Sequence, residues 1–410
     1  MNYDDYKDVD VNNKIVVMLR GKPADFPSEE GAHYVSRNQR RAAAVKHGAV
    51  GMISLQTPQE EARYSYQRIV KTIATPAMNW LNEQQQPNDY FPQLKARALL
   101  SVDAASKLLA NANYNYEQLI ELAKANKPLP KFKLEGKLAV KSRSLHKSVV
   151  SHNVVAMIEG TDPALRDQVI VYSAHLDHIG TSHTAHQTDD QATHAENDID
   201  IVNNGALDNA SGVAIMLETA RLFAENPPKR SILFVAVTGE EKGLLGSDFF
   251  ARNPTVDIDN IVANINLDMP LILYPIGDVI AFGAQHSTMG QFVQQAAERV
   301  GLQLSPDPMP EENIFVRSDH YSFVKQGVPS VFLMPGFKSL DESVDGGKIF
   351  KEFFAEHYHQ ETDESTLPIN YQSGAIFTQV NYLIGDNIAN SDQLPRWHEN
   401  NFFGELYKRK

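Results

Sequence analysis

Residues 231–247 read SILFVAVTGEEKGLLGS, and this stretch decides the fold. Its first seven residues are mostly apolar and β-branched, which is typical of a strand buried on both faces of a parallel sheet. Two adjacent acids, Glu240 and Glu241, follow the end of this strand and precede a helix start. Ligands of open α/β sheets bind outside the carboxyl ends of the strands, so the two acids stand where a binding site is expected.

Two interpretations of the acid pair are open. Adjacent carboxylates repel each other and are costly to bury without a cation, which favours a metal site in which one Glu is a ligand and the other carries a proton. Alternatively, both acids are solvated at the start of a helix, where negative charge is favoured in any case. The rest of the chain decides between these interpretations.

Composition limits the class of protein. With 410 residues the chain is too long for one typical core, so we expect two domains. No uninterrupted apolar run is long enough to span a bilayer. The net charge of -13 argues against binding to nucleic acid or to anionic membrane surfaces. The chain has no cysteine, so any metal must be held by His, Asp and Glu.

The N-terminal sequence bears on the compartment. Residues 1–6 are acidic and aromatic, and they lack the basic start and the apolar centre of a signal peptide. Either the protein is cytoplasmic, or a signal peptide and further residues were removed from it.

Strands that alternate with helices predict an α/β fold with a mostly parallel, mixed central sheet and helices on both faces. The expected strands are 168–174, 231–237, 261–267, 279–283 and 329–334, and the expected helices are 213–225, 289–300 and 371–387. A helical and then Pro-rich stretch at 111–130 predicts a domain boundary, with a small α/β domain at 1–130 and a larger domain at 131–410. Residues 132–140 are expected to form the first strand of the larger domain.

Several expected strand ends and turns of the larger domain carry a possible metal ligand. These residues are His175, Asp208, Glu240, Glu241 and Asp268. The carboxyl ends of parallel strands lie on one edge of a sheet, so these side chains can converge. The sequence therefore predicts a metal site at that edge.

Single residues of this set also have simpler explanations. Asp208, next to Asn209, could belong to a helix N-cap. His175 and Asp177 could form a surface pair, although an acid two residues after a His also suits the support of a metal-bound imidazole. Three further histidines in an acidic loop are interpreted as solvated, namely His183, His186 and His194.

Together, the motifs resemble a known family. They lie at 175–177, 204–212, 240–247, 266–268 and 317–323. In this order they are similar to the co-catalytic dizinc aminopeptidases, the clan that also holds glutamate carboxypeptidase II and the transferrin receptor. The resemblance covers roughly residues 131–410, and it implies the zinc exopeptidase fold and two zinc ions per chain.

The resemblance also implies a role for each residue. Asp208 would bridge the two ions, His175 and Asp268 would complete one ion, and Glu241 and a last His would complete the other. The family pattern for this His, a Tyr-His context before Thr-Asp, matches His359, with His357 as the nearby alternative. Glu240 would be the general base, and Asp177 would support His175.

The sequence indicates the substrate-binding residues less clearly than the metal ligands. Some relatives place an oxyanion-stabilising Tyr shortly before the Ser-Asp-His motif, where this chain has Ile314, Phe315 and Val316. Tyr358 is the candidate substitute, and packing is its alternative role. Arg317 could bind a substrate carboxylate or pair with an acid.

The first domain has a resemblance of its own. Residues 8–17 and 42–51 are similar to the protease-associated domain that is inserted in many of these peptidases. The segments that precede this part in the family are missing, so we expect an N-terminally truncated chain. Relatives with this insert are usually exported, which favours a periplasmic or secreted protein.

The leading hypothesis is a zinc exopeptidase that removes N-terminal residues from peptide substrates. The alternatives are a carboxypeptidase or dipeptidase that acts on short acidic peptides, a glutaminyl cyclase, and a non-catalytic protein like the transferrin receptor. His175 and the second Glu weigh against the cyclase, which has one zinc. All five ligands are present, which weighs against the receptor.

Overall fold

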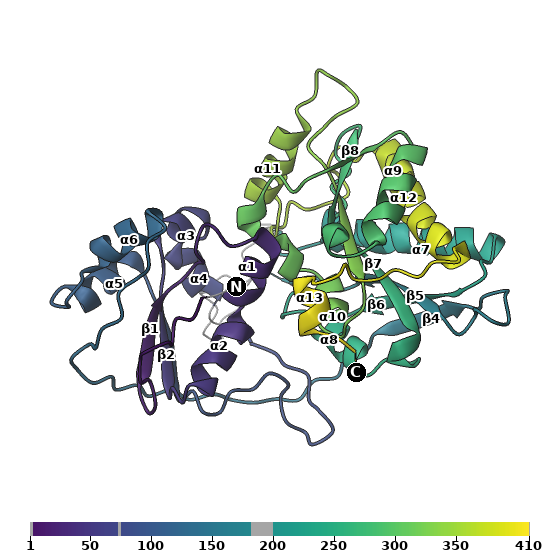
Figure 1. Cartoon of the computed structure of the whole chain (residues 1–410). Helices are drawn as coiled ribbons and strands as arrows, with labels where there is room; N and C mark the ends of the chain where they lie inside the picture. The colour runs from purple at the N-terminus through teal and green to yellow at the C-terminus, as the bar shows by residue number, and fades with distance from the viewer. Residues whose placement is uncertain (1–2, 73–74, 182–199, 410) are drawn as a thin grey trace, which may run out of the picture. The chain divides into compact units, whose positions relative to one another are not determined.

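The computed structural model describes residues 3–72, 75–181 and 200–409. The chain divides into two compact units, residues 1–149 and 150–410 (Figure 1). Each unit has its own sheet, of three strands in the first and seven in the second.

The first unit is a small α/β layer structure. Its strands are parallel, in the order β1 (Ile15–Leu19), β2 (Gly51–Leu55), β3 (Ala96–Leu100). One face packs on α5 (Val102–Leu109) and α6 (Tyr116–Lys124), whose buried apolar residues share a core with Ile53 and Leu55. The other helices of this unit are α1 (Ser28–Val35), α2 (Arg37–Lys46), α3 (Pro58–Arg63) and α4 (Tyr66–Thr72). Its assignment to a protease-associated domain stays a prediction.

The strand predicted at 132–140 is wrong, because residues 131–153 contain no helix or strand. Two of its apolar side chains, Leu138 and Val140, are 45% and 55% exposed. The alternating pattern suits a strand, but no neighbouring strand offers its backbone as a partner, and an unpaired strand is not stable in water.

The second unit contains the mostly parallel, mixed sheet that the sequence predicts. Its strand order is β4-β6-β5-β7-β10-β8-β9. The bounds are β4 (Val154–Ile158), β5 (Val169–His175), β6 (Ser231–Val237), β7 (Ile261–Leu267), β8 (Asp278–Phe282), β9 (Gln303–Ser305) and β10 (Ser330–Pro335). Strands β6, β5, β7 and β10 are mutually parallel, whereas β4 and β8 run antiparallel to their neighbours β6 and β10.

Helices cover both faces of this sheet, α7, α9 and α12 on one side and α8 and α10 on the other (Figure 1). On β6, Ile232 and Phe234 belong to the first core, whereas Leu233 and Val235 belong to the second, as the alternation of side chains in a strand requires. The helices of the unit are α7 (Ser211–Glu225), α8 (Leu245–Arg252), α9 (Met289–Arg299), α10 (His320–Val324), α11 (Gly346–Glu356), α12 (Tyr371–Asn390) and α13 (Phe402–Leu406). Short helical turns are η1 (Ala206–Ala210), η2 (Ile258–Asn260), η3 (Ala284–His286), η4 (Pro310–Glu312) and η5 (Ile314–Val316).

The register of the central strands brings their carboxyl ends together. His175, the last residue of β5, is paired with Val237, the last residue of β6. On its other side β5 pairs with β7, with Ser173 opposite Asn266. The loops after these three strands therefore start from one edge of the sheet.

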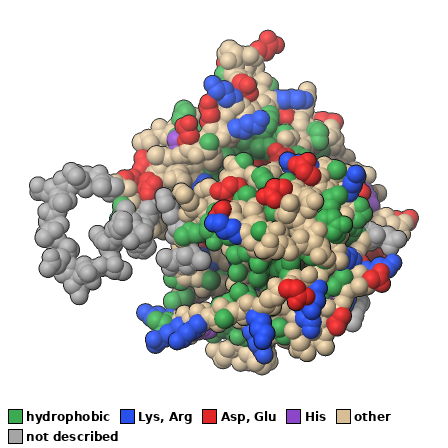
Figure 2. All heavy atoms as spheres, turned by 90° about the vertical axis from the view of Figure 1, so that its left-hand side faces the viewer, with side chains coloured by type: hydrophobic (Ala, Val, Ile, Leu, Met, Phe, Trp, Pro, Cys, Tyr) green, Lys and Arg blue, Asp and Glu red, His purple; other side chains and the backbone are tan. Residues whose placement is uncertain are grey.

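The surface of the described residues carries both charged and large apolar side chains. None of the helices in the described part of the chain combines the length and the apolar character needed to cross a bilayer. On the face drawn in Figure 2, the coloured residues mix acidic, basic and hydrophobic side chains, so charge of one sign does not gather there.

Packing between α12 and β5 yields a stability prediction. The Tyr172 hydroxyl donates a hydrogen bond of 2.6 Å to the Asn381 carbonyl, and a methyl group on Gly385 would overlap that hydroxyl. We expect Gly385→Ala to lower the free energy of unfolding by about 1–3 kcal/mol, measured from the shift in the denaturation midpoint. The same substitution in a Tyr172→Phe background should cost less; an equal cost in both backgrounds would contradict the proposed overlap.

Candidate metal centre

The predicted ligands come from separate loops at the carboxyl edge of the sheet. His175 ends β5, the pair Glu240 and Glu241 follows β6, and Asp268 follows β7. Asp208 lies in η1, directly before α7. The last predicted ligand, His359, lies in the loop after α11.

The structure brings these residues into two adjacent groups that share Asp208. In the first group, His175 Nε2 lies 3.2 Å from Asp208 Oδ1 and 3.1 Å from Asp268 Oδ1. In the second, His359 Nε2 lies 3.3 Å from Asp208 Oδ2 and 2.9 Å from Glu241 Oε2. Asp208 therefore turns one carboxylate oxygen toward each group, which is the geometry of a bridging residue.

One further histidine lies in the second group and was missed from the sequence. His178 Nδ1 lies 2.9 Å from Glu241 Oε1 and 3.9 Å from Asp208 Oδ2. The available signal was its place three residues after His175 at the same strand end. The alternative to His359, His357, instead places Nδ1 2.9 Å from Thr362 Oγ1. His183, His186 and His194 lie outside the described residues.

Asp177 contacts His175 through its backbone rather than its carboxylate. His175 Nδ1 lies 2.9 Å from the Asp177 carbonyl oxygen. A carbonyl can only accept, so Nδ1 carries the proton and Nε2 turns its lone pair toward Asp208 and Asp268. A lone pair that faces two carboxylates needs a cation between them, either a proton or a metal ion.

Two buried side chains fix the turn that carries Asp208. Asn209 donates through Nδ2 to the Leu267 carbonyl at 2.9 Å and accepts from the Met269 backbone at 3.1 Å, which ties the turn to the end of β7. Asp363 accepts from the backbone N–H groups of Leu207 and Asp208 at 2.9 and 3.0 Å, one with each carboxylate oxygen.

Asp268 is held by a chain of polar side chains that runs from β5 and β7 to the segment before α10. The Ser173 hydroxyl donates to Asn266 Oδ1 at 2.6 Å, and Asn266 Nδ2 donates to Ser318 Oγ at 2.6 Å. Ser318 in turn donates to Asp268 Oδ2 at 2.5 Å. The second oxygen of Asp268 is thereby occupied, and Oδ1 remains directed at His175.

Glu240 differs from its neighbour Glu241. No hydrogen bond or ion pair joins its side chain to a histidine among the described residues, whereas Glu241 contacts both His178 and His359. Burial raises the pKa of Glu240 well above its usual value, and the nearby carboxylates of Asp268, Asp319 and Glu241 add to this rise against the opposing charge of His175.

Tyr358 and Arg317 lie together beside the second group. The Tyr358 ring stacks on His359 with a centroid distance of 3.9 Å, and Arg317 Nη2 donates to its hydroxyl at 3.3 Å. Burial raises the pKa of Tyr358 well above its usual value, so its hydroxyl keeps its proton. Arg317 is also 3.6 Å from Glu312, which agrees with the structural role left open by the sequence.

The residues fit a pair of zinc ions. Asp208 and Asp268 are buried, and the ion-pair partners of Asp208, Asp268 and Glu241 among the described residues are imidazoles. Several buried atoms of the second group have no hydrogen-bond partner, namely Glu241 Oε1, His359 Nε2 and His178 Nδ1. Unpaired buried nitrogen and oxygen donors at one point are a donor set that zinc favours when thiolates are absent.

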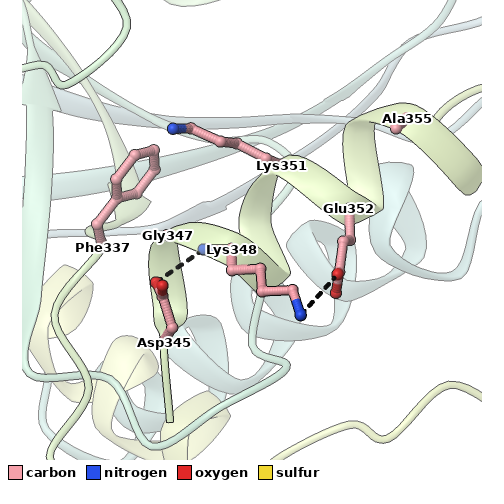
Figure 3. Close-up of a pocket in the computed structure, with 7 residues that line it drawn as sticks. All are labelled: Phe337, Asp345, Gly347, Lys348, Lys351, Glu352 and Ala355. Atoms are coloured by element: carbon pink, nitrogen blue, oxygen red, sulfur yellow. Dashed lines mark hydrogen bonds and ion pairs between the residues drawn. The ribbon is translucent and has the colours of Figure 1, made fainter.

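One hollow of this unit reaches the metal centre, and another lies away from it. A hollow of about 280 Å³ is lined by His175, Asp177, His178 and the chain around Gly205. A larger one of about 580 Å³ lies on α11 (Figure 3). Three of its polar side chains have local partners, since Asp345 accepts from the Lys348 backbone at 2.9 Å and Lys348 lies 3.5 Å from Glu352. It contains none of the predicted site residues.

The sequence of the chain is similar to sequences of known metalloproteases. Residues 153–382 match peptidase family M28. A "Probable zinc metalloprotease" of Phaeosphaeria nodorum is 36% identical over 121 residues, which cover 28% of this chain and 23% of that protein. A second, of Pyricularia oryzae, is 40% identical over 116 residues, or 27% of this chain and 20% of that protein. The matched part thus spans about a fifth of the length of these curated relatives.

A solved structure shows the same fold. The aminopeptidase from Aneurinibacillus sp. strain AM-1 superposes with a TM-score of 0.50 at 18% identity, covering 94% of this chain and 72% of that chain. The mixed sheet and the paired His-acid groups define a metal centre at the carboxyl edge of an α/β fold. The chain belongs to peptidase family M28, whose cofactor is a pair of zinc ions.

The two hydrogen bonds to Asp363 yield a second prediction. In Asp363→Asn, the amide group would face one of the two backbone N–H groups with its own N–H, so the turn that carries Asp208 should shift. We expect zinc affinity to fall by roughly 10- to 100-fold, measured by competition with a chromophoric chelator. The control is Asp162→Asn, whose carboxylate also accepts a backbone N–H, from Ala164 at 2.8 Å, on the exposed surface. Equal zinc affinity in both variants would contradict the role of Asp363.

Proposed function

We propose that this chain is a zinc exopeptidase that removes residues from the N-terminus of peptides. The observation that carries the proposal is the position of Asp208 between two His-acid groups. Glu240 is near enough for the charges of His175, Asp268 and Glu241 to act on it, yet no hydrogen bond or ion pair joins its side chain to a histidine among the described residues. When bound, a pair of zinc ions would polarise the substrate carbonyl and lower the pKa of water, so that a nucleophilic hydroxide is available near neutral pH.

The residues of the chain would bind the ions, orient the ligands and transfer the proton. His175, Asp208 and Asp268 would hold one ion, and Asp208, Glu241 and His359 the other. The Asp177 carbonyl keeps the proton of His175 on Nδ1, so Nε2 is free to bind. Glu240 would take the proton of the attacking water and pass it to the leaving amine.

Tyr358 is suited to stabilise the oxyanion that forms when the carbonyl is attacked. Its hydroxyl keeps its proton and accepts the bond from Arg317, so the O–H can donate to a developing negative charge. Arg317 thereby orients Tyr358 rather than the substrate.

Charge favours an aminopeptidase over a carboxypeptidase. The α-ammonium group of a substrate would find carboxylates at the site, among them Glu241 and Asp268. A substrate carboxylate would need a cationic partner, and Arg317 is already engaged with Glu312 and Tyr358. The resemblance to relatives with a protease-associated insert leads us to propose peptides outside the cytoplasm as substrates.

The role of Glu240 is tested by Glu240→Gln. We expect the variant to keep two zinc ions per chain and to lose about 10²- to 10⁴-fold in kcat on aminoacyl p-nitroanilides, because the amide cannot take the proton. Glu352→Gln on α11 serves as the matched surface control. Normal turnover by Glu240→Gln would contradict the assignment of Glu240 as the general base. If the wild type hydrolysed N-acetylated substrates as fast as those with a free amino group, the proposed exopeptidase specificity would be wrong.

The role of Tyr358 is tested by Tyr358→Phe. Loss of one oxyanion donor should lower kcat by roughly 10²- to 10³-fold with little change in KM. A packing role would instead show as a lower unfolding temperature with normal kcat. Steady-state kinetics and thermal unfolding on the same preparation separate the two.

A further inference from the structure

We propose that His178 is a third imidazole ligand of the metal pair, and that it binds the ion held by Asp208, Glu241 and His359. This inference rests on the proposed dizinc function and adds a residue to it. It would leave the two ions unequal, one with three protein ligands and one with four.

His178 is fixed against the second group. Its side chain is 8% exposed, and its ring lies edge-on to that of His359, with 5.5 Å between the ring centroids. Gly205, in the left-handed conformation with φ of 66°, allows this position, since a Cβ there would lie 2.9 Å from His178 Cγ. The sequence around Asp208 thus leaves room for this ring.

The contact between His178 and Glu241 does not have the geometry of a hydrogen bond. Nδ1 and Oε1 are only 2.9 Å apart, yet neither atom has a hydrogen-bond partner. A hydrogen bond requires the N–H to point at the acceptor. Two ligands of one ion instead point their lone pairs at a common third position, which brings them close without such alignment.

The distances agree with a shared ion. Ligand atoms at about 2.0–2.1 Å from a tetrahedral zinc lie about 3.3 Å apart. His178 Nδ1 lies 2.9 Å from Glu241 Oε1 and 3.9 Å from Asp208 Oδ2, so one distance is below this value and the other is above it. The distances of His359 Nε2 are similar, 2.9 Å to Glu241 Oε2 and 3.3 Å to Asp208 Oδ2.

Unequal ligand sets give the two ions different roles. Four protein ligands are typical of a closed, structural zinc site, whereas three leave a position open for chemistry. The ion of His175, Asp208 and Asp268 would then keep the open position and exchange more readily. The ion of His178 would be retained longest when metal is withdrawn.

Two substitutions separate a ligand from a residue that merely holds Glu241. His178→Ala removes both functions. His178→Asn keeps a short N–H donor near the place of Nδ1 but no imidazole nitrogen, so it would preserve a hydrogen bond to Glu241 and not a zinc bond. His152→Ala, which removes an exposed imidazole of the same unit, is the matched control.

The experiment measures zinc content, stepwise zinc affinity by chelator competition, and the imidazole scattering in zinc X-ray absorption spectra of the full chain. Circular dichroism of the metal-free variants checks folding. We expect wild type and His152→Ala to bind two ions with scattering from three imidazoles. Both His178 variants should bind one ion more than about a hundredfold more weakly, beyond the range of residues that only orient a ligand.

Three results would overturn the inference. Unchanged imidazole scattering in His178→Ala would exclude a zinc–His178 bond, and normal zinc affinity in His178→Asn would reduce His178 to a positioning residue. Each of these leaves the proposed dizinc function intact, because wild type still binds two ions. Absence of zinc from correctly folded wild type would refute that function as well.

Discussion

The structure depends on carboxylates that crowd one edge of a buried sheet. Asp208 lies in one group with Asp268 and in a second group with Glu241, and among the described residues the ion-pair partners of all three are histidines. In a medium of low polarity such charges cannot remain unpaired. A pair of dications resolves the repulsion, so metal binding and the stability of this edge are expected to be coupled.

The fold fixes the positions of these carboxylates through strand pairing and through hydrogen bonds between side chains and the backbone. Parallel strands bring the loops after β5, β6 and β7 to one edge, and side chains that are not ligands then set the positions of those that are. Asn209 joins the Asp208 turn to β7, and Asp363 joins the same turn to the loop that carries His359. Residues far apart in the chain thereby act as one rigid site.

Different parts of the site carry different demands. The proposed ligand His175 has to present a lone pair at a fixed point, and its contact with the Asp177 carbonyl favours this. The proposed general base, Glu240, has to remain free of the ligand set, and no hydrogen bond or ion pair joins its side chain to a histidine among the described residues. The proposed oxyanion donor, Tyr358, has to keep its proton, which burial favours by raising its pKa. These demands explain why adjacent residues such as Glu240 and Glu241 are directed to different neighbours.

Local sequence determined the buried strand at 231–237, the mostly parallel sheet and the acids at the strand ends, because periodicity and strand–helix alternation depend on near neighbours. Family resemblance was needed for His359, whose loop has no local pattern that marks a ligand. Only the tertiary structure brought in His178, directed the Asp177 backbone rather than its carboxylate to His175, and left 132–140 without a strand. For His178 the deciding partners, Glu241 and Asp208, are distant in sequence, and 132–140 lacks a neighbouring strand among the described residues. The contact of the Asp177 backbone with His175 depends instead on how the chain turns after β5.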